Sequence, residues 1–409
     1  MGETGDEDCL YLNVYVPTDS MDHQKKFDVV VIIHGGAFMI GSGHLAQSEF
    51  LVDRDLIFVT FNYRLGALGF LSTEDEVIPG NYGMKDQVLA LKWVRENIAS
   101  FGGLFVRGIS QSGTALDPWA IRRHPLERAR KLAILLGCSD ESTQELKKCL
   151  KQKPARLILE KQGHFYGIGQ STDLAECHFL LRTRGREEIR ESVFGRRTAL
   201  SPQRAQGPRR ALDLFYSEVD KVNDVWPQIA PFMLDYNYTL PESKREEVAK
   251  QIFTDRLFAI GSDTAAKLQS KTNKSPVYYY YFNYQKGENK ALKFYAPNEQ
   301  ELEGVAHGED MFYFYGFNGL KKFSEGDTKL KNACQDMLYS YATKGIPSVD
   351  GTDKWIPTKY SELTYLNITD ADDIKLQTVD SLAPTEFWRD IGLLEYELYS
   401  DEKDTKDEL

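Results

Sequence analysis

The stretch Val29-Val-Val-Ile-Ile33, followed at once by His34-Gly-Gly-Ala-Phe38, decides the fold of this chain. A continuous run of β-branched residues predicts a strand that helices cover on both faces. A second such run, 56–61, ends in Asn62-Tyr-Arg64, and the alternating apolar residues of 10–16 predict a half-buried strand. These runs predict a sheet with a covered, apolar centre.

Helical spacing follows these strands. Apolar side chains at Met84, Val88, Leu91, Val94 and Ile98 predict a helix, and a pair of glycines just beyond can cap its end. The alternation of strand and helix therefore predicts an α/β sheet. Further along, we expect helices over 224–234, 243–268, 332–343 and 387–398, and a strand over the aromatic run 277–284.

The composition narrows the class of protein. The 409 residues are 42% apolar and carry 61 acidic against 50 basic side chains, a net charge of −11. This excludes a collagen-like or wholly disordered chain and leaves room for one large core or two. The acidic balance argues against nucleic acid, because phosphate binding needs a basic footprint. No apolar run approaches the roughly 18–20 residues that cross a bilayer, so no transmembrane segment is expected.

The segment 162–212 differs from the rest of the chain. No lysine occurs between Lys161 and Lys221, whereas Arg182 to Arg210 contains nine arginines. Three interpretations stay open: a basic patch for nucleic acid or a membrane surface, a mobile or disordered loop, or a shifted reading frame. We favour the third, because lysine gives way to arginine while the apolar period is lost.

The cysteines show no ligand spacing with histidine, so no metal site is expected. In an oxidising lumen Cys138 and Cys149 could close a short loop. An odd number leaves one cysteine without a partner inside the chain. The five are Cys9, Cys138, Cys149, Cys177 and Cys334.

The tail 400–409 ends in Lys406, Asp407, Glu408 and Leu409, the address that the KDEL receptor reads in the lumen of the endoplasmic reticulum. Sequons at Asn237 and Asn367 fit glycosylation there. The acidic N-terminus lacks the features of a signal peptide. We expect the lumen of the endoplasmic reticulum as the location, with secretion as the alternative.

The glycines after the first strand allow two interpretations. They let the backbone approach an acyl oxygen, so that two successive N–H groups can stabilise a developing negative charge. They also fit an ordinary tight turn. The rest of the sequence decides between the two.

Further motifs follow in a fixed order: Glu7-Asp-Cys-Leu-Tyr-Leu-Asn13, Asn62-Tyr-Arg-Leu-Gly66, Gly80-Asn-Tyr-Gly-Met-Lys-Asp-Gln87, Leu91-Lys-Trp-Val94, Phe101-Gly-Gly103, Gly108-Ile-Ser-Gln-Ser-Gly113 and Gly304-Val-Ala-His-Gly-Glu-Asp310. With these motifs the chain resembles the type B carboxylesterases, a cholinesterase-like family of the α/β-hydrolase fold, and insect carboxylesterases and juvenile hormone esterases most of all. The resemblance implies one domain over 1–409, with a mixed, mostly parallel central sheet flanked by helices. It also implies hydrolysis of small carboxylic esters by a Ser-His-Glu triad, without a cofactor.

The resemblance assigns roles residue by residue. His307 matches the general base, and Gly36 and Ala37 match two oxyanion donors. Without the family, a lone histidine between small residues would be interpreted as structural. Cys138 and Cys149 match a short disulfide loop, while the family partner of Cys9 lies upstream of the residues present.

The match fails at the nucleophile. Relatives continue from Gly103 into a strand, a Gly-Glu-Ser-Ala-Gly elbow and a helix, but here Leu104 follows directly and no Gly-x-Ser-x-Gly occurs. The acid is expected within the arginine-rich segment, where nothing matches. Ser110 could imitate the elbow, yet Ser112 stands where the second glycine belongs, so an ordinary strand end is favoured. We therefore expect an incomplete, unstable and inactive hydrolase, or alternatively a non-catalytic binding protein of the same fold.

Overall fold

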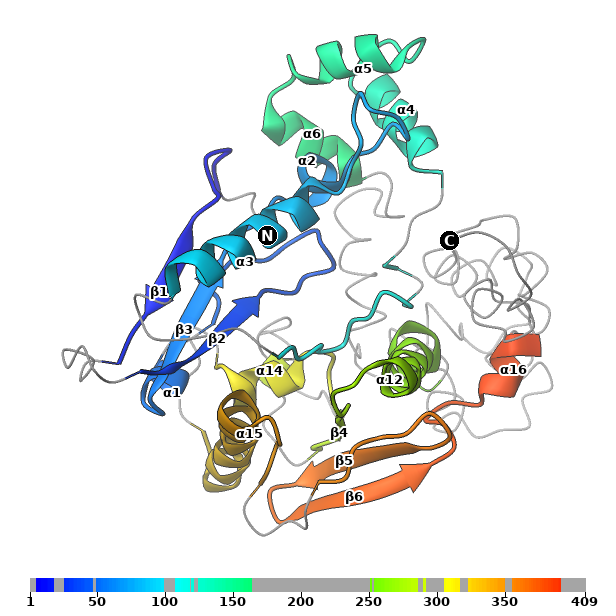
Figure 1. Cartoon of the computed structure of the whole chain (residues 1–409). Coiled ribbons are helices and arrows are strands. Elements are labelled where there is room, and N and C mark those ends of the chain that lie inside the picture. The colour runs from blue at the N-terminus through cyan, green and yellow to red at the C-terminus, as the bar shows by residue number, and fades with distance from the viewer. Residues whose placement is uncertain are drawn as a thin grey trace, which may run out of the picture.

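The computed structural model describes residues 5–17, 26–46, 49–98, 107–117, 119–120, 124–163, 251, 254–285, 290–291, 305–316, 323–349 and 355–390. Strands and helices alternate along these residues, as the sequence predicts for an α/β protein (Figure 1). The arginine-rich stretch from 164 onward, the helix expected over 224–234, Asn237 and the tail 400–409 lie outside the described residues.

The first sheet has the strand order β1-β3-β2. Strand β1 (Leu12–Tyr15) is antiparallel to β3 (Leu56–Phe61), and β2 (Asp28–Ile33) is parallel to it. Every residue of β3 is buried, whereas β2 is partly buried along its length and exposed at both ends. The expectation of full cover therefore holds for β3 and is wrong for β2, because β2 forms an edge of this sheet in the described part of the chain.

Helices cover both faces of this sheet. On one face, Val29 and Val31 pack with Val94 and Ile98, which belong to the C-terminal part of α3 (Tyr82–Asn97) or follow it directly. On the other face, Val30 and the neighbouring alternate residues pack against a larger core that includes α15 (Glu325–Lys344). The period of two along the strands thus assigns each helix to one face.

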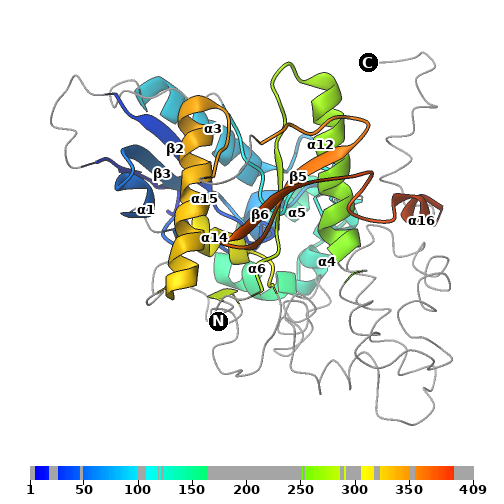
Figure 2. The same ribbon diagram turned by 90° about the horizontal axis from the view of Figure 1, so that it is seen from below.

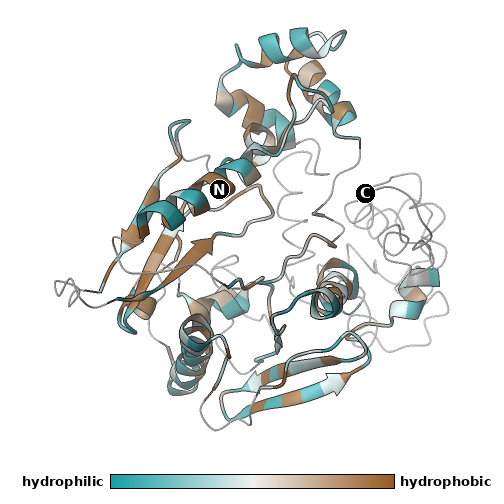
Figure 3. Cartoon of the chain, viewed as in Figure 1, coloured by the Kyte–Doolittle hydropathy of each residue, from teal (hydrophilic) through white to brown (hydrophobic). Residues whose placement is uncertain are grey.

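The second sheet has the order β4-β5-β6. Strand β4 (Tyr279–Phe282) is parallel to β5 (Leu363–Asp370), which is antiparallel to β6 (Asp373–Val379). Hydrophobic and hydrophilic residues alternate along β5 and β6 (Figure 3). One face of this sheet packs on α12 (Ile260–Thr272), and the other joins the core that α15 lines.

Among the described residues the strands are grouped in two three-stranded sheets. Each sheet has one parallel and one antiparallel pair of strands. The segment 107–117 runs between the sheets without forming a strand (Figures 1 and 2). Since both sheets nevertheless pack on one hydrophobic cluster, they belong to one core.

Helix α3 buries only part of its apolar surface. Val94 and Ile98 are 1% exposed, as the helical spacing predicts. Met84 and Val88, which share the helical spacing, are exposed, and together with Leu89 and Trp93 they are 41–66% exposed. These four side chains form an exposed apolar strip on α3.

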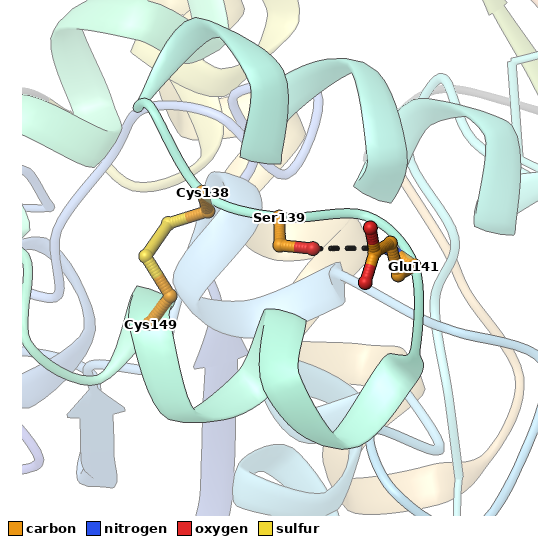
Figure 4. The surroundings of a disulfide bond; sticks show 4 residues. All are labelled: Cys138, Ser139, Glu141 and Cys149. Atoms are coloured by element: carbon orange, nitrogen blue, oxygen red, sulfur yellow. Dashed lines mark hydrogen bonds between the residues drawn. A yellow bond between two sulfur atoms is a disulfide. The ribbon is translucent and has the colours of Figure 1, made fainter.

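A helical hairpin carries the disulfide bond. Cys138 and Cys149 are bonded, which confirms the expected pairing, and the backbone N–H of Glu141 donates to Ser139 Oγ inside the loop at 3.3 Å (Figure 4). The flanking helices are α4 (Pro125–Leu135), α5 (Thr143–Leu150) and α6 (Ala155–Gln162). Among the described residues Cys9 and Cys334 are unbridged, and Cys177 lies outside them.

Shorter elements complete the description. They are α1 (Glu49–Val52), α2 (Gly66–Phe70), the π-helical turn η5 (Asp255–Ala259), α14 (Glu309–Phe314) and α16 (Thr385–Asp390). None of the described helices is long and apolar enough to span a bilayer.

Candidate active site

The turn after β2 has an unusual backbone. Gly36, Ala37 and Phe38 have positive φ angles of 117°, 52° and 59°. A Cβ atom on Gly36 would lie 1.9 Å from the carbonyl oxygen of Ile40, so only glycine fits. The N–H groups of Met39 and Ile40 both donate to the carbonyl of Gly36, at 2.9 and 3.1 Å, and close the turn. A strained conformation for Ala37 is therefore held in place by its neighbours.

This conformation leaves two amides available. Within the described part of the chain, the N–H groups of Gly36 and Ala37 donate to no acceptor. Ala37 is exposed to solvent and Gly36 is partly exposed. Successive unpaired amides at the end of a strand suit an oxyanion better than a plain turn, because a plain turn has no use for free donors.

Tyr63 fixes the start of the turn. Its hydroxyl donates to the carbonyl of His34 at 2.8 Å, and its ring stacks on the imidazole with the centroids 4.4 Å apart. Burial lowers the pKa of His34 and raises that of Tyr63 to about 12, so both rings are neutral near pH 7. The N–H of Gly66 donates to the carbonyl of Phe38 at 2.7 Å and fixes the other end.

A bidentate ion pair ties this region to α3. Arg64 Nε and one terminal nitrogen donate to the two carboxylate oxygens of Asp86, each at 2.7 Å, and the backbone N–H of Arg64 adds a third bond at 3.1 Å. Burial alone would raise the pKa of Asp86, but the hydrogen bonds and charge of Arg64 outweigh it and lower that pKa. The two motifs that contain these residues thus form one structural unit.

His307 lies in the turn before α14. Gly308, in the left-handed conformation with φ at 79°, begins the helix, and His307 is exposed. Its imidazole stacks on the ring of Phe258, with the centroids 4.6 Å apart and the planes 17° apart. Ala306, next to His307, packs on the same core as Ile32 of β2. The turn that carries His307 and the glycine turn after β2 therefore extend from one core.

A buried network supports the helix after His307. The carboxylate of Glu309 accepts from the backbone N–H groups of Lys290 and Ala291 at 2.9 and 2.7 Å, and its pKa is raised because burial outweighs these bonds. Lys290 Nζ in turn donates to Asp327 at 2.6 Å, and the hydroxyl of Tyr313 donates to the same carboxylate at 3.0 Å. The network fixes the end of α14 from which His307 projects.

The loop that carries Ser110 lies against α14 but has no elbow geometry. Gln111 Nε2 and the hydroxyl of Tyr280 donate to the carboxylate of Asp310, at 2.9 and 2.8 Å. Burial raises the pKa of Asp310. Ser110 Oγ donates to the carbonyl of Gly113, and residues 107–113 form neither strand nor helix. The expectation that Ser110 ends an ordinary strand is therefore wrong, and the strand-to-helix turn of a nucleophile elbow is equally absent there.

Asp117 and Asp255 are two further buried carboxylates. Burial raises the pKa of Asp117 to about 7, although the backbone N–H of Thr114 donates to it at 2.6 Å. Burial raises the pKa of Asp255 in η5 to about 6, against a 2.6 Å bond from Gln251. Both groups change charge near neutral pH.

The remaining expected sites have mixed outcomes. Asn367 lies within the middle strand β5, where its side-chain N–H donates to Gln377 at 3.4 Å, and its glycosylation stays a prediction. The place expected for the triad acid lies outside the described residues. No cluster of metal-ligating side chains occurs among the residues that the structure describes.

The family model for the carboxylesterase family matches residues 1–104, 103–178 and 197–388. The chain belongs to the carboxylesterase family. The match is interrupted at 103–104, where Leu104 follows Gly103, and again between 178 and 197, inside the arginine-rich segment.

Known relatives align with nearly the whole length of this chain. A carboxylic ester hydrolase of Bombus ignitus is 33% identical over 463 residues, which is 98% of this chain and 82% of that protein. Venom carboxylesterase-6 of Apis mellifera is 32% identical over 463 residues, 96% of this chain and 81% of that protein. The crystal structure of juvenile hormone esterase from Manduca sexta matches with a TM-score of 0.73 and 22% identity, over 94% of this chain and 84% of that one. The fold is that of the α/β-hydrolases.

Phe258 lies outside the motifs, and the bond between Gln111 and Asp310 joins two motifs whose contact was not predicted. Phe258 lies in the 243–268 region, where the sequence predicts only a helix. Asp310 follows Glu309 at the start of a helix whose other residues are apolar or aromatic, and this acidic pair was a usable signal.

Proposed function

We propose that this chain is a carboxylic ester hydrolase by descent that has lost its nucleophile and hydrolyses esters at a negligible rate. The observation that carries the proposal is the absence of any Gly-x-Ser-x-Gly sequence in the 409 residues. The retained parts are the amides of Gly36 and Ala37, for an oxyanion, and His307, for proton transfer. Without a serine to attack the acyl carbon, neither part has a covalent intermediate to act on.

The comparisons support an internal loss. Alignments to the bee proteins span 463 positions and cover 98% and 96% of the 409 residues of this chain, so more than 54 of the aligned positions lie opposite gaps in it. One interruption of the family match is at 103–104. A strand, an elbow and part of a helix would fit into gaps of that total size.

The expected loss of activity is large. Removing a triad serine costs on the order of 10⁶ in kcat, and roughly 10³–10⁴ over water survives through the oxyanion hole and binding. The absence of the acid adds little, because triad members act as a unit. Turnover should therefore be indistinguishable from that of a variant without the base.

A fluorophosphonate probe, which forms a bond only with an activated serine, tests the proposal on the full chain. We expect no labelling, and equal hydrolysis of 4-nitrophenyl butyrate by wild type, His307→Gln, Ser110→Ala and the surface control His44→Gln. Covalent labelling that disappears in Ser110→Ala would overturn the proposal and make Ser110 the nucleophile. A hydrolysis rate that is lower in His307→Gln than in the wild type, and unchanged in His44→Gln, would also overturn the proposal. Turnover would then depend on His307.

A non-catalytic binding protein of the same fold is the alternative, and the lost nucleophile is what favours it. A binding protein needs neither a base nor free oxyanion donors, so His307 and the glycine turn argue for the hydrolase origin. Equilibrium dialysis with butyrate, the carboxylate product, distinguishes the two. Binding that Gly36→Val abolishes supports a retained hydrolase site, and binding that Gly36→Val leaves unchanged supports a different surface.

We also propose residence in the lumen of the endoplasmic reticulum, with retention by the KDEL receptor through residues 406–409. The Cys138–Cys149 disulfide supports an oxidising compartment. Expression behind a secretory leader, with and without residues 406–409, tests this. Retention that depends on these four residues is expected, and secretion of both forms would contradict it. A mobility shift on endoglycosidase treatment, lost in Asn237→Gln or Asn367→Gln, tests the two sequons.

A further inference from the structure

The disulfide-bonded helices differ in charge from the rest of the chain. Residues 124–163 contain nine lysines and arginines against five carboxylates, a net charge of +4, so the other residues carry −15 if the whole chain is to total −11. Helices α4, α5 and α6 lie at one end of the described structure, far from the second sheet (Figure 1). The chain therefore has a basic end on an acidic body.

Helix α4 presents basic and apolar side chains to solvent together. Its inner face packs in a core cluster with α5 and α6. On the outer face Arg130 and Lys131 are exposed, and one turn further on Ile134 and Leu135 are 60% and 40% exposed. The helical period places these four side chains on one strip. A basic pair followed by an apolar pair thus covers the outer face of α4.

The disulfide holds a second basic pair beside this strip. Cys149 is bonded to Cys138, with 5.8 Å between their Cα atoms (Figure 4). Lys148 and Lys151, on either side of Cys149, are exposed, and Cys138 follows Leu135 by three residues. The bond therefore keeps the basic end of α5 next to the apolar end of α4.

The charges of this region are largely uncompensated. Within the described ranges, no ion pair or hydrogen bond is formed by the side chains of Arg130, Lys131, Lys148 and Lys151. Helix α4 contains one carboxylate, Glu127, in its first turn. Several unpaired charges of one sign attract a partner of the opposite sign and raise its rate of association. The partner of this region should therefore be anionic.

We propose that this region docks on an anionic lipid bilayer through a basic face that consists of Arg130, Lys131, Ile134, Leu135, Lys148 and Lys151. A bilayer has charged headgroups above an apolar layer, so it contacts basic and apolar side chains at once. Clusters of about four to eight lysines and arginines on an amphipathic helix are typical of sites for anionic lipids. An acidic protein would need the charges alone. Salt screens the acidic body of the chain beyond about 10 Å, so its repulsion by the bilayer is weak.

Flotation of the full chain with vesicles in a sucrose gradient tests the proposal, because aggregated protein stays at the bottom. The chain should float with vesicles of phosphatidylcholine and phosphatidylserine in equal parts, and not with phosphatidylcholine alone. Arg130→Gln/Lys131→Gln should lower the partition coefficient about 25-fold, which is about fivefold for each charge. Ile134→Ser/Leu135→Ser should lower it about tenfold, because less apolar area is buried. Raising the salt from about 0.1 M to about 1 M should release the wild type.

The matched control is Lys329→Gln/Lys375→Gln. It removes the same two charges from lysines that are 59% and 72% exposed and that each lie beside an aspartate, so this variant should float as the wild type does. Glu127→Gln removes the carboxylate of α4 and should raise the partition coefficient about fivefold. It decides the matter if Arg130→Gln/Lys131→Gln does not fold, and an unchanged coefficient would then contradict the proposal.

Four outcomes overturn the proposal. They are no flotation, equal flotation with both kinds of vesicle, equal loss in the control variant, and flotation that Leu89→Ser/Trp93→Ser abolishes while Ile134→Ser/Leu135→Ser leaves it unchanged. The last would assign the lipid contact to α3. If flotation is absent and the chain forms an oligomer at low salt that Arg130→Gln/Lys131→Gln dissociates, the partner is a second copy. None of these results depends on turnover or on labelling by the fluorophosphonate.

Discussion

Lys290 and Asp327 form a buried ion pair next to the helix that follows His307. Their side chains are 3% and 0% exposed, and Nζ lies 2.6 Å from the carboxylate oxygen. The ammonium also lies over the ring of Phe323, 4.6 Å from its centroid. Lys290→Met keeps the length of the side chain and removes its charge, which leaves the carboxylate with Tyr313 as a remaining donor. Breaking such a pair costs about 3–5 kcal/mol, because a buried charge is left uncompensated.

The assay is urea unfolding followed by far-ultraviolet circular dichroism. Lys329→Met is the matched control. Lys329 lies on α15, as Asp327 does, and pairs with Asp372, and the side chains of Lys329 and Asp372 are 59% and 73% exposed. Exposed pairs contribute below about 1 kcal/mol, so this variant should unfold nearly as the wild type does. Lys290→Met/Asp327→Asn should recover much of the loss, because neither charge then remains. Equal effects of the two single lysine changes, or no recovery in the double variant, would refute the argument.

The same pair predicts a pH dependence. Burial would raise the pKa of Asp327, but the hydrogen bond and charge of Lys290 outweigh it and lower that pKa in the folded state. The unfolded chain therefore binds the proton more tightly. The stabilisation is present above the unfolded pKa of about 4 and is lost as pH falls through the lower, folded value. Without Lys290 the pKa should rise, so Lys290→Met should lose stability at a higher pH than the wild type.

Two further predictions concern other parts of the fold. Replacing both Cys138 and Cys149 by serine should lower the free energy of unfolding by about 3 kcal/mol, from the loop entropy of an 11-residue separation, and thermal melts with and without reductant measure it. Arg64→Lys should cost about 1 kcal/mol in urea unfolding, because lysine cannot donate the two parallel bonds to Asp86, whereas Arg95→Lys at an exposed pair should cost almost nothing. Equal costs at the two arginines would contradict it.

Local elements could be predicted from the sequence, because their signals are local. The run 29–33 is strand β2, the helical spacing from Met84 to Ile98 matches α3 within two residues at its start, and the aromatic run contains β4. The ends differ by a few residues, which tertiary contacts decide. The Cys138–Cys149 pair followed from the family resemblance and is confirmed.

Features that depend on a missing neighbour could not be predicted from local patterns. The apolar residues of β2 look like those of a fully covered strand, yet its burial depends on a strand beside it. Likewise Met84 and Val88 have the spacing of a buried helix face, yet both are exposed in the described structure. The spacing of apolar residues predicts which side chains can be buried. Whether they are buried depends on another element that packs on them.

Some residues of the candidate site could also be predicted from the sequence, and others could not. Gly36 could be predicted because successive glycines indicate a backbone conformation that other residues avoid. Its φ of 117° is such a conformation. His307 was identified by its motif and not by its own chemistry. Phe258 had no signal, since the π-helical turn that displays it is one residue's departure from an ordinary helical pattern.

One structural cause accounts for the proposed inactivity and for the unusual surfaces. A strand followed by a helix, placed between β2 and β4, would join the two sheets, and its helix would have an apolar face to set against α3. In the described residues the irregular segment 107–117 contacts β4 and α14 through Gln111, and the apolar strip of α3 is exposed. An open strand edge and exposed apolar side chains both favour association with other chains. The proposed loss of the nucleophile segment should therefore also reduce solubility, and activity and solubility should return together if the strand and helix of a bee relative are inserted after Gly103.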